Sequence, residues 1–236
     1  MENTDVILLC IKAQSMFDFL AINFNSFKNK PLVFCSKGID TKYCLFQTEI
    51  AEKFLDKKLF SVLSGPGFAS DIVREKPIAL SLACKNVNLG KKVQHMLSSP
   101  SIRIYLNNDL IGTQLGGAVK NVIAIACGVA EGKYLGENAR SSIITRGLQE
   151  IVYLGKKMGA NVTTFYGLSG IGDLNLTCNS RKSRNFKLGF KLAQGLNISK
   201  IDNMSFLAEG LHSSSSVNKL ATNYDIEMPI CSAVKD

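Results

Sequence analysis

The sequence predicts an α/β protein whose first part forms a parallel sheet and whose second part is entirely helical. Short apolar runs alternate with amphipathic stretches up to about residue 107, an order typical of a parallel sheet covered by helices. Beyond about residue 110 the strand-like runs stop and only helical patterns follow. With 236 residues, of which 46% are hydrophobic, the chain can bury a sizeable core.

Five apolar runs have the length and the β-branched content of buried strands. They occupy residues 6–11, 31–36, 59–64, 78–83 and 102–106. Three amphipathic stretches between these runs predict helices over residues 13–25, 46–55 and 87–97. The first three strands and the two helices that connect them therefore predict parallel β-α-β units, and the last two runs extend the sheet.

Four helical patterns make up the rest of the chain. They cover residues 114–130, 138–158, 183–194 and 206–223, and the boundary with the sheet falls near Asn107–Gly112. No apolar segment is both long and uncharged enough to predict a membrane span, because the best candidate, Leu115–Ala130, carries Lys120 near its middle.

The composition limits the class of protein. Seven cysteines lack any CxxC spacing and mostly lie in apolar runs, which indicates reduced thiols in a cytoplasmic protein. The only two histidines lie near no cysteine pair, so we expect no metal site. A net charge of +9 favours an acidic partner such as nucleic acid, an anionic membrane or a phosphorylated metabolite, or else reflects lysines spread over the surface.

The helix predicted around Lys120 carries the first chemical signal. It is apolar on nearly every side, which is typical of a buried helix, and Lys120 and Asn121 are its polar exceptions. Burial of an unpaired ammonium costs several kcal/mol and lowers the pKa of the amine toward neutrality. Lys120 is therefore either a proton-transfer group with a partner or a lysine that extends to the surface.

Two segments directly follow predicted strands, at the sheet edge where α/β proteins bind ligands. They are Lys37–Gly38 and the glycine-rich Ser64–Ala69. Each is either part of a ligand site or an ordinary turn.

A third segment, Gly167–Cys178, is a glycine-rich loop that presents Asp173. Ser183, Arg184 and Asn185 then open a helix, where free amides and an arginine can bind phosphate. The alternative is a solvated helix start capped by Ser183. Because few aromatic residues are interleaved there, we expect no nucleic-acid surface.

Taken in order, these segments resemble the NAD(P)-dependent glycerol-3-phosphate dehydrogenases of the bacterial type. The segments that carry the resemblance are Ser36–Ile39, Leu63–Ala69, Leu115–Val122, Asn138–Arg140, Ile144–Gly147 and Phe165–Leu174. The resemblance implies an incomplete, partial Rossmann-like parallel sheet for dinucleotide binding over residues 1–109. It further implies an all-α C-terminal substrate and catalytic domain over residues 110–236.

The resemblance also implies an activity. This is the reduction of dihydroxyacetone phosphate to sn-glycerol 3-phosphate, a precursor of glycerophospholipids, with NAD or NADP as cofactor and Lys120 as general acid and base. It implies a cytoplasmic protein and a possible homodimer. The implied catalytic residues are Lys120, Lys37, Asp173 and Thr177.

Binding residues follow from the same resemblance. For the substrate they are Lys37, Gly65, Gly67, Lys120, Asn121, Asp173, Ser183, Arg184 and Asn185. For the cofactor they are Lys37, Ala69, Arg184, Leu207 and Glu209.

The chain departs from the family pattern at two places. Gly67 stands where a serine or threonine is usual, so one hydroxyl contact is lost. No GxGxxG turn occurs, and we expect the strands that would carry it to lie upstream. We therefore expect impaired cofactor binding. The sequence does not indicate a preference for NADH or NADPH, because the residues that contact the ribose 2′ position would lie in the same upstream part. Three hypotheses stay open: an enzyme, an inactive truncated remnant of the same enzyme, and a basic nucleic-acid-binding module.

Overall fold

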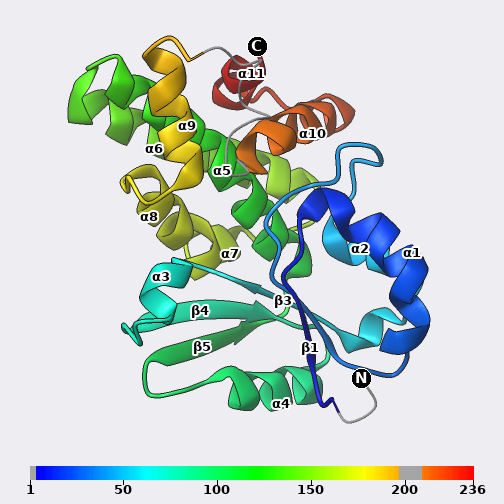
Figure 1. Ribbon diagram of the computed structural model, residues 1–236. Helices are drawn as coiled ribbons and strands as arrows, with labels where there is room; N and C mark the ends of the chain where they lie inside the picture. Colours follow the sequence, from blue (N-terminus) through cyan, green and yellow to red (C-terminus); the bar gives the residue numbers. More distant parts are fainter. Residues whose placement is uncertain (1–3, 197–208) are drawn as a thin grey trace.

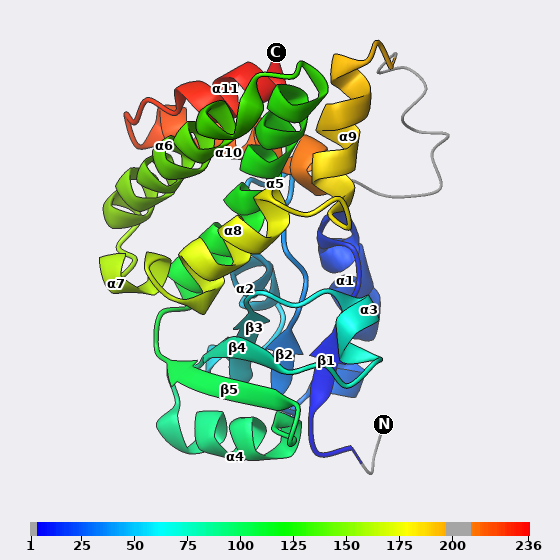
Figure 2. The same cartoon turned by 90° about the vertical axis from the view of Figure 1, so that its left-hand side faces the viewer.

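The computed structural model describes residues 4–196 and 209–236. A five-stranded sheet with its helices forms one half of the molecule, and a bundle of helices sits on one end of that sheet (Figures 1 and 2). This arrangement confirms the predicted α/β class with a helical second part.

All five predicted strands are present, in the spatial order β1-β2-β3-β4-β5. Their bounds are β1 Ile7–Leu9, β2 Leu32–Phe34, β3 Phe60–Ser64, β4 Ile78–Ala83 and β5 Ile102–Asn107. The pairs β1–β2, β2–β3 and β4–β5 are parallel, as predicted.

The β3–β4 pair is antiparallel, so the predicted parallel sheet is mixed at this one pair of strands. The segment between these strands contains only the four-residue helix α3, Ala69–Ile72. A parallel connection usually contains a full helix that packs on the sheet. The connection over residues 65–77 has only α3 and turns the chain back alongside β3.

Helices cover both faces of the sheet. On one face α1 (Met16–Phe27) and α2 (Gln47–Ala51) enclose a core that includes Leu20, Phe34 and Phe60. On the other face α4 (Val87–Leu97) packs beside β4 and β5, as Figure 1 shows. The helix α4 has its predicted bounds, whereas the first predicted helix begins with a single 3-10 turn and α2 is shorter than predicted.

The helical half is organised around one central helix, α5. This helix spans Leu110–Gly132 and is buried along almost its whole length. The other helices of this half are α6 Gly136–Lys157, α7 Val162–Phe165, α8 Asp173–Cys178, α9 Arg184–Ala193, α10 Glu209–Asn223 and α11 Pro229–Lys235. The sequence did not predict α7, α8 and α11, because helices of four to seven residues are too short to show a period.

Among the described residues, α5 is the one helix with the length and apolar character of a membrane span, yet 89% of its most apolar window is buried inside the protein. It is therefore the core helix around which the bundle packs. The strands end at Asn107 and α5 begins at Leu110, where the sequence placed the change from strands to helices. A division into two domains at residue 109 stays a prediction.

Asp109 links the start of α5 to α7. Its Oδ1 accepts the Gly112 backbone N–H at 2.8 Å, which caps α5. Its Oδ2 accepts the Asn161 backbone N–H at 2.9 Å and the Thr164 hydroxyl at 2.8 Å. One carboxylate thus holds two elements of the helical half together.

We expect Asp109→Ala to lower the free energy of unfolding by about 2 kcal/mol, because the helix cap and the two bonds to α7 are lost together. Asp109→Asn keeps one acceptor oxygen and should lose about half as much. Urea denaturation with an unchanged slope measures both effects. An alanine variant as stable as the wild type would show that this carboxylate does not join the two helices energetically.

Candidate functional site

A cleft of about 850 Å³ lies where the helical half meets the carboxyl ends of β1 and β2. This edge of a parallel sheet is the usual ligand position in α/β proteins. The residues of the sequence prediction that line the cleft come from both halves of the chain. They are Lys37, Gly67, Ala69, Lys120, Asn121, Thr177, Ser183, Arg184, Asn185 and Glu209.

Lys120 lies at the bottom of this cleft, with only 7% of its surface exposed. Its Nζ donates to Asp173 Oδ1 at 2.6 Å and to the Thr177 hydroxyl at 2.8 Å. Asp173 begins α8 and Thr177 lies one turn further on, so that both side chains face α5 from the same side of a short helix. The buried amine therefore has the partners that its burial requires.

A second ammonium reaches the same carboxylate from the sheet. Lys37 follows β2, and its Nζ donates to Asp173 Oδ2 at 2.6 Å and to the Gly65 carbonyl at 3.0 Å. Gly65 has a φ of 137°, which favours glycine, and this backbone shape follows the end of β3. Asp173 therefore bridges two lysines that come from different halves of the protein.

Glycine at position 117 leaves room for Lys37. A Cβ at this position would lie 3.4 Å from Lys37 Cγ and 3.1 Å from Ser64 Oγ. Gly117 thus lets the strand ends approach α5.

The charges in this cluster shift each other's pKa values. Burial, and after it the ammonium of Lys37, lower the pKa of Lys120 to about 8, although Asp173 acts in the opposite direction. Burial alone would raise the pKa of Asp173, but the two ammonium groups outweigh it and the pKa is lowered. Asp173 is therefore ionised at neutral pH. The pKa of Lys120 lies close enough to neutral pH for the amine both to donate and to accept a proton.

The start of α9 forms another wall of the cleft. Ser183 caps the helix, since its hydroxyl accepts the Phe186 backbone N–H at 3.3 Å. Arg184 is exposed to the cleft, and Asn185 is buried with its Oδ1 bound to the Gly210 N–H at 3.0 Å. The helix start presents an arginine and backbone amides, which together suit an anion.

Glu209 begins α10 and lines the cleft. One of its carboxylate oxygens, Oε2, is buried without a hydrogen-bond partner among the described residues. Burial raises the pKa of Glu209, against the effect of His212 and Arg184. Leu207, the other late cofactor residue of the sequence prediction, lies outside the described residues.

Sequence reasoning missed part of the cleft wall. Cys10, Ile11 and Lys12 follow β1 and line the cleft beside Cys35. The rule that drew attention to Lys37, the position directly after a buried strand, applies equally to Cys10–Lys12 and could have identified them. Lys182 also lines the cleft, and it bonds to Asp71 of α3 at 3.0 Å across the cleft mouth.

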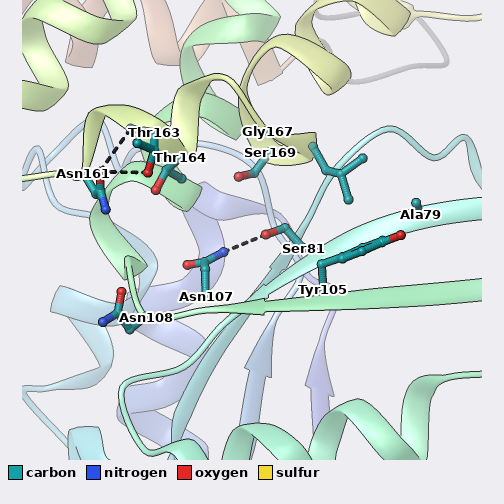
Figure 3. Close-up of a pocket in the computed structure, with 11 residues that line it drawn as sticks. Ala79, Ser81, Tyr105, Asn107, Asn108, Asn161, Thr163, Thr164, Gly167 and Ser169 are labelled. Atoms are coloured by element: carbon teal, nitrogen blue, oxygen red, sulfur yellow. Dashed lines mark hydrogen bonds between the residues drawn. The ribbon is translucent and has the colours of Figure 1, made fainter.

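A second hollow of about 420 Å³ lies beside the turn Leu168–Gly172 and is shown in Figure 3. Its wall includes Ser81, Asn107 and Thr164, and none of the described residues that line it is charged at neutral pH. It therefore lacks the proton-transfer groups that distinguish the first cleft. Within 4–196 and 209–236, no three histidine, cysteine or carboxylate side chains gather as metal ligands.

Comparison with known proteins agrees with this geometry. Residues 109–236 match the family model described as the C-terminus of NAD-dependent glycerol-3-phosphate dehydrogenase, and residues 1–90 match the model of its N-terminus. The chain is 44% identical over 208 residues to a glycerol-3-phosphate dehydrogenase [NAD(P)+] of Parvibaculum lavamentivorans, an overlap of 88% of this chain and 62% of the relative. It is 41% identical over 237 residues to the protein of the same name from Maridesulfovibrio salexigens, an overlap of 99% of this chain and 72% of that relative.

The crystal structure of glycerol-3-phosphate dehydrogenase from Coxiella burnetii superposes with a TM-score of 0.93 at 32% identity, covering 99% of this chain and 72% of that one. Several of the curated relatives are considerably longer, since the chain spans between 59% and 64% of their length. Both family models and the overlap along nearly the whole of this chain lead to one assignment. The chain belongs to the NAD-dependent glycerol-3-phosphate dehydrogenase family.

Proposed function

We propose that this protein acts in the NAD(P)-dependent reduction of dihydroxyacetone phosphate to sn-glycerol 3-phosphate. One observation carries the proposal. A buried lysine, Lys120, is paired with Asp173 and Thr177 at the bottom of a cleft whose wall is an arginine-bearing helix start. Such a cleft can bind a phosphate at one place and deliver a proton at another.

The described residues fit the nicotinamide end of the cofactor. The carboxyl ends of β1 and β2 form one wall of the cleft, and Ala69, Arg184 and Glu209 also line it. The unpartnered Glu209 Oε2 is a buried acceptor suited to an amide N–H. When bound there, the reduced nicotinamide supplies the hydride for the keto carbon.

Lys120 supplies the proton in this proposal. As negative charge develops on the keto oxygen, the ammonium stabilises it and then donates its proton. In the reverse direction the neutral amine accepts the proton from the alcohol. A pKa of about 8 suits both directions, because each protonation state is well populated near neutral pH.

Asp173 and Lys37 position and tune this amine. The carboxylate fixes Lys120 from one side, and the hydroxyl of Thr177 fixes it from another. Lys37 lies on the opposite carboxylate oxygen, where it lowers the pKa of Lys120 and adds positive charge to the cleft. We assign to Lys37 a share in the stabilisation of the oxyanion.

The phosphate of the substrate would lie at the start of α9. Ser183 and Asn185 hold the helix start in place, and Arg184 offers a forked donor to a phosphate. Gly65 and Gly67 allow the loop after β3 to approach the substrate, and Asn121 lines the cleft next to Lys120. Binding energy from the phosphate then orients the carbonyl toward Lys120.

The remaining expectations belong to the same proposal. They are a homodimer, a cytoplasmic location, and the use of either NAD or NADP. The activity is tested with dihydroxyacetone phosphate as substrate, and the loss of NADH absorbance measures its reduction. A folded protein without turnover that still binds glycerol 3-phosphate would support the inactive remnant instead.

Arg184→Gln should weaken binding of glycerol 3-phosphate by about tenfold to a hundredfold, because a charge-assisted contact to the phosphate is lost. Binding of glycerol should not change. Isothermal titration measures both, and Lys187→Gln on the exposed side of the same helix is the matched control. Equal affinity of the Arg184 variant and the control would remove Arg184 from the phosphate site.

The pH dependence of turnover should report Lys120. Since the ammonium is the acid, kcat/KM for ketone reduction should fall as the pH rises through about 8, and the rate of alcohol oxidation should rise over the same range. Lys120→Ala should lower turnover by about a thousandfold and abolish this pH dependence. Lys156→Ala, on the exposed face of α6, is the control. A profile that persists in Lys120→Ala would refute the assignment.

Asp173→Asn should lower the free energy of unfolding by about 3 kcal/mol at pH 7, because two ammonium groups lose their buried counter-charge. The loss should shrink at pH 9, where the Lys120 amine is largely neutral in the folded protein. Urea denaturation at both pH values measures it. Asp71→Asn, which breaks an exposed pair with Lys182, is the control and should cause no measurable loss. Identical effects of the two variants would contradict the buried pairing.

A further inference from the structure

We propose that Cys10 and Cys35 form a dithiol site at the wall of the cleft, which thiol–disulfide exchange with a small disulfide converts into a Cys10–Cys35 bond. This proposal does not rest on the proposed dehydrogenase activity. Neither cysteine was singled out by the sequence, which indicated only scattered, mostly buried thiols.

The sheet places the two thiols side by side. β1 and β2 are neighbouring strands (Figure 2). They pair in parallel, and Leu9 is the register partner of Phe34. The Cys35 N–H donates to the Leu9 carbonyl at 3.1 Å, which closes this last pair of the ladder. Cys10 and Cys35 are the residues that directly follow it on the two strands, and their side chains interact. Neighbouring strands are about 4.8 Å apart, which lies within the Cα separation of about 4.4–6.8 Å found in disulfides.

Both thiols line the same cleft, but they differ in exposure. Cys10 is exposed and Cys35 is partly buried. Burial, and after it the neighbouring Cys10, raise the pKa of Cys35 to about 12, against the effect of Lys37. Cys10 is therefore the thiol that an outside reagent reaches first, and Cys35 is the second thiol that stands beside it.

The chemistry balances in two exchange steps. The Cys10 thiolate attacks a sulfur of the small disulfide, which forms a mixed disulfide on Cys10 and releases one small thiolate. Cys35 then loses its proton and its sulfur attacks the Cys10 sulfur, which forms the Cys10–Cys35 bond and releases the second small thiolate. The two cysteines lose two electrons and two protons, and the small disulfide is reduced to two thiols.

A second pair of cysteines provides an internal control. Cys127 of α5 and Cys178 of α8 also influence each other, but both are fully buried in the core between these helices. They do not line the cleft. A reagent in solution cannot reach Cys127 and Cys178. In the folded protein this pair should therefore stay unreactive while Cys10 and Cys35 react.

The test treats the folded wild-type protein with oxidised glutathione and maps its disulfides by mass spectrometry. We expect a loss of two hydrogen atoms from the protein and a Cys10–Cys35 link, with Cys127 and Cys178 still reduced. Cys35→Ser should instead retain glutathione on Cys10, and Cys10→Ser should react at least about tenfold more slowly.

Two results would overturn the proposal. One is a wild-type protein in which Cys10 and Cys35 both remain free after prolonged exposure to excess oxidised glutathione. The other is a mixed disulfide on Cys10 that persists in the wild type as long as in Cys35→Ser, which would show that Cys35 cannot reach it. The wild-type result needs no variant, so it stands even where a serine variant fails to fold.

Discussion

The structure depends on one carboxylate, Asp173, shared by two ammonium groups. Two lysines at the meeting point of a sheet and a helical bundle would repel each other, and burial makes each positive charge expensive. The carboxylate offsets both charges with bonds of 2.6 Å to Lys37 and Lys120. Since one lysine follows β2 and the other lies on α5, this cluster also joins the two halves of the protein.

The rest of the architecture brings these three groups to one place. The central helix α5 holds Lys120 rigidly because its residues are buried on nearly all sides. Gly117 lets the strand ends come close enough for Lys37 to lie beside this helix. The short helix α8 directs Asp173 and Thr177 at the amine. A site built on packed helices and strand ends is pre-organised, so little ordering remains to be done when a ligand binds.

The same sheet edge carries two kinds of reactive side chain. The positions directly after β1 and β2 carry Lys12 and Lys37 as cations, and Cys10 and Cys35 as thiols. Parallel strands place equivalent positions next to each other, so that two residues of the same kind, 25 apart in the chain, become neighbours. The proposed dithiol site and the proposed catalytic cluster therefore share a wall of one cleft while they use different atoms.

The sequence by itself determined the five strands, the long helices and the chemical type of the site. Apolar runs defined all five strands and the long helices, and an amine in an apolar helix marked Lys120, because burial patterns follow directly from hydrophobicity. Only the tertiary structure decided that β4 runs antiparallel to β3 and that Asp173 bridges Lys37 and Lys120. Strand direction and contacts between residues 136 apart depend on how the chain crosses itself in space, which no local pattern contains.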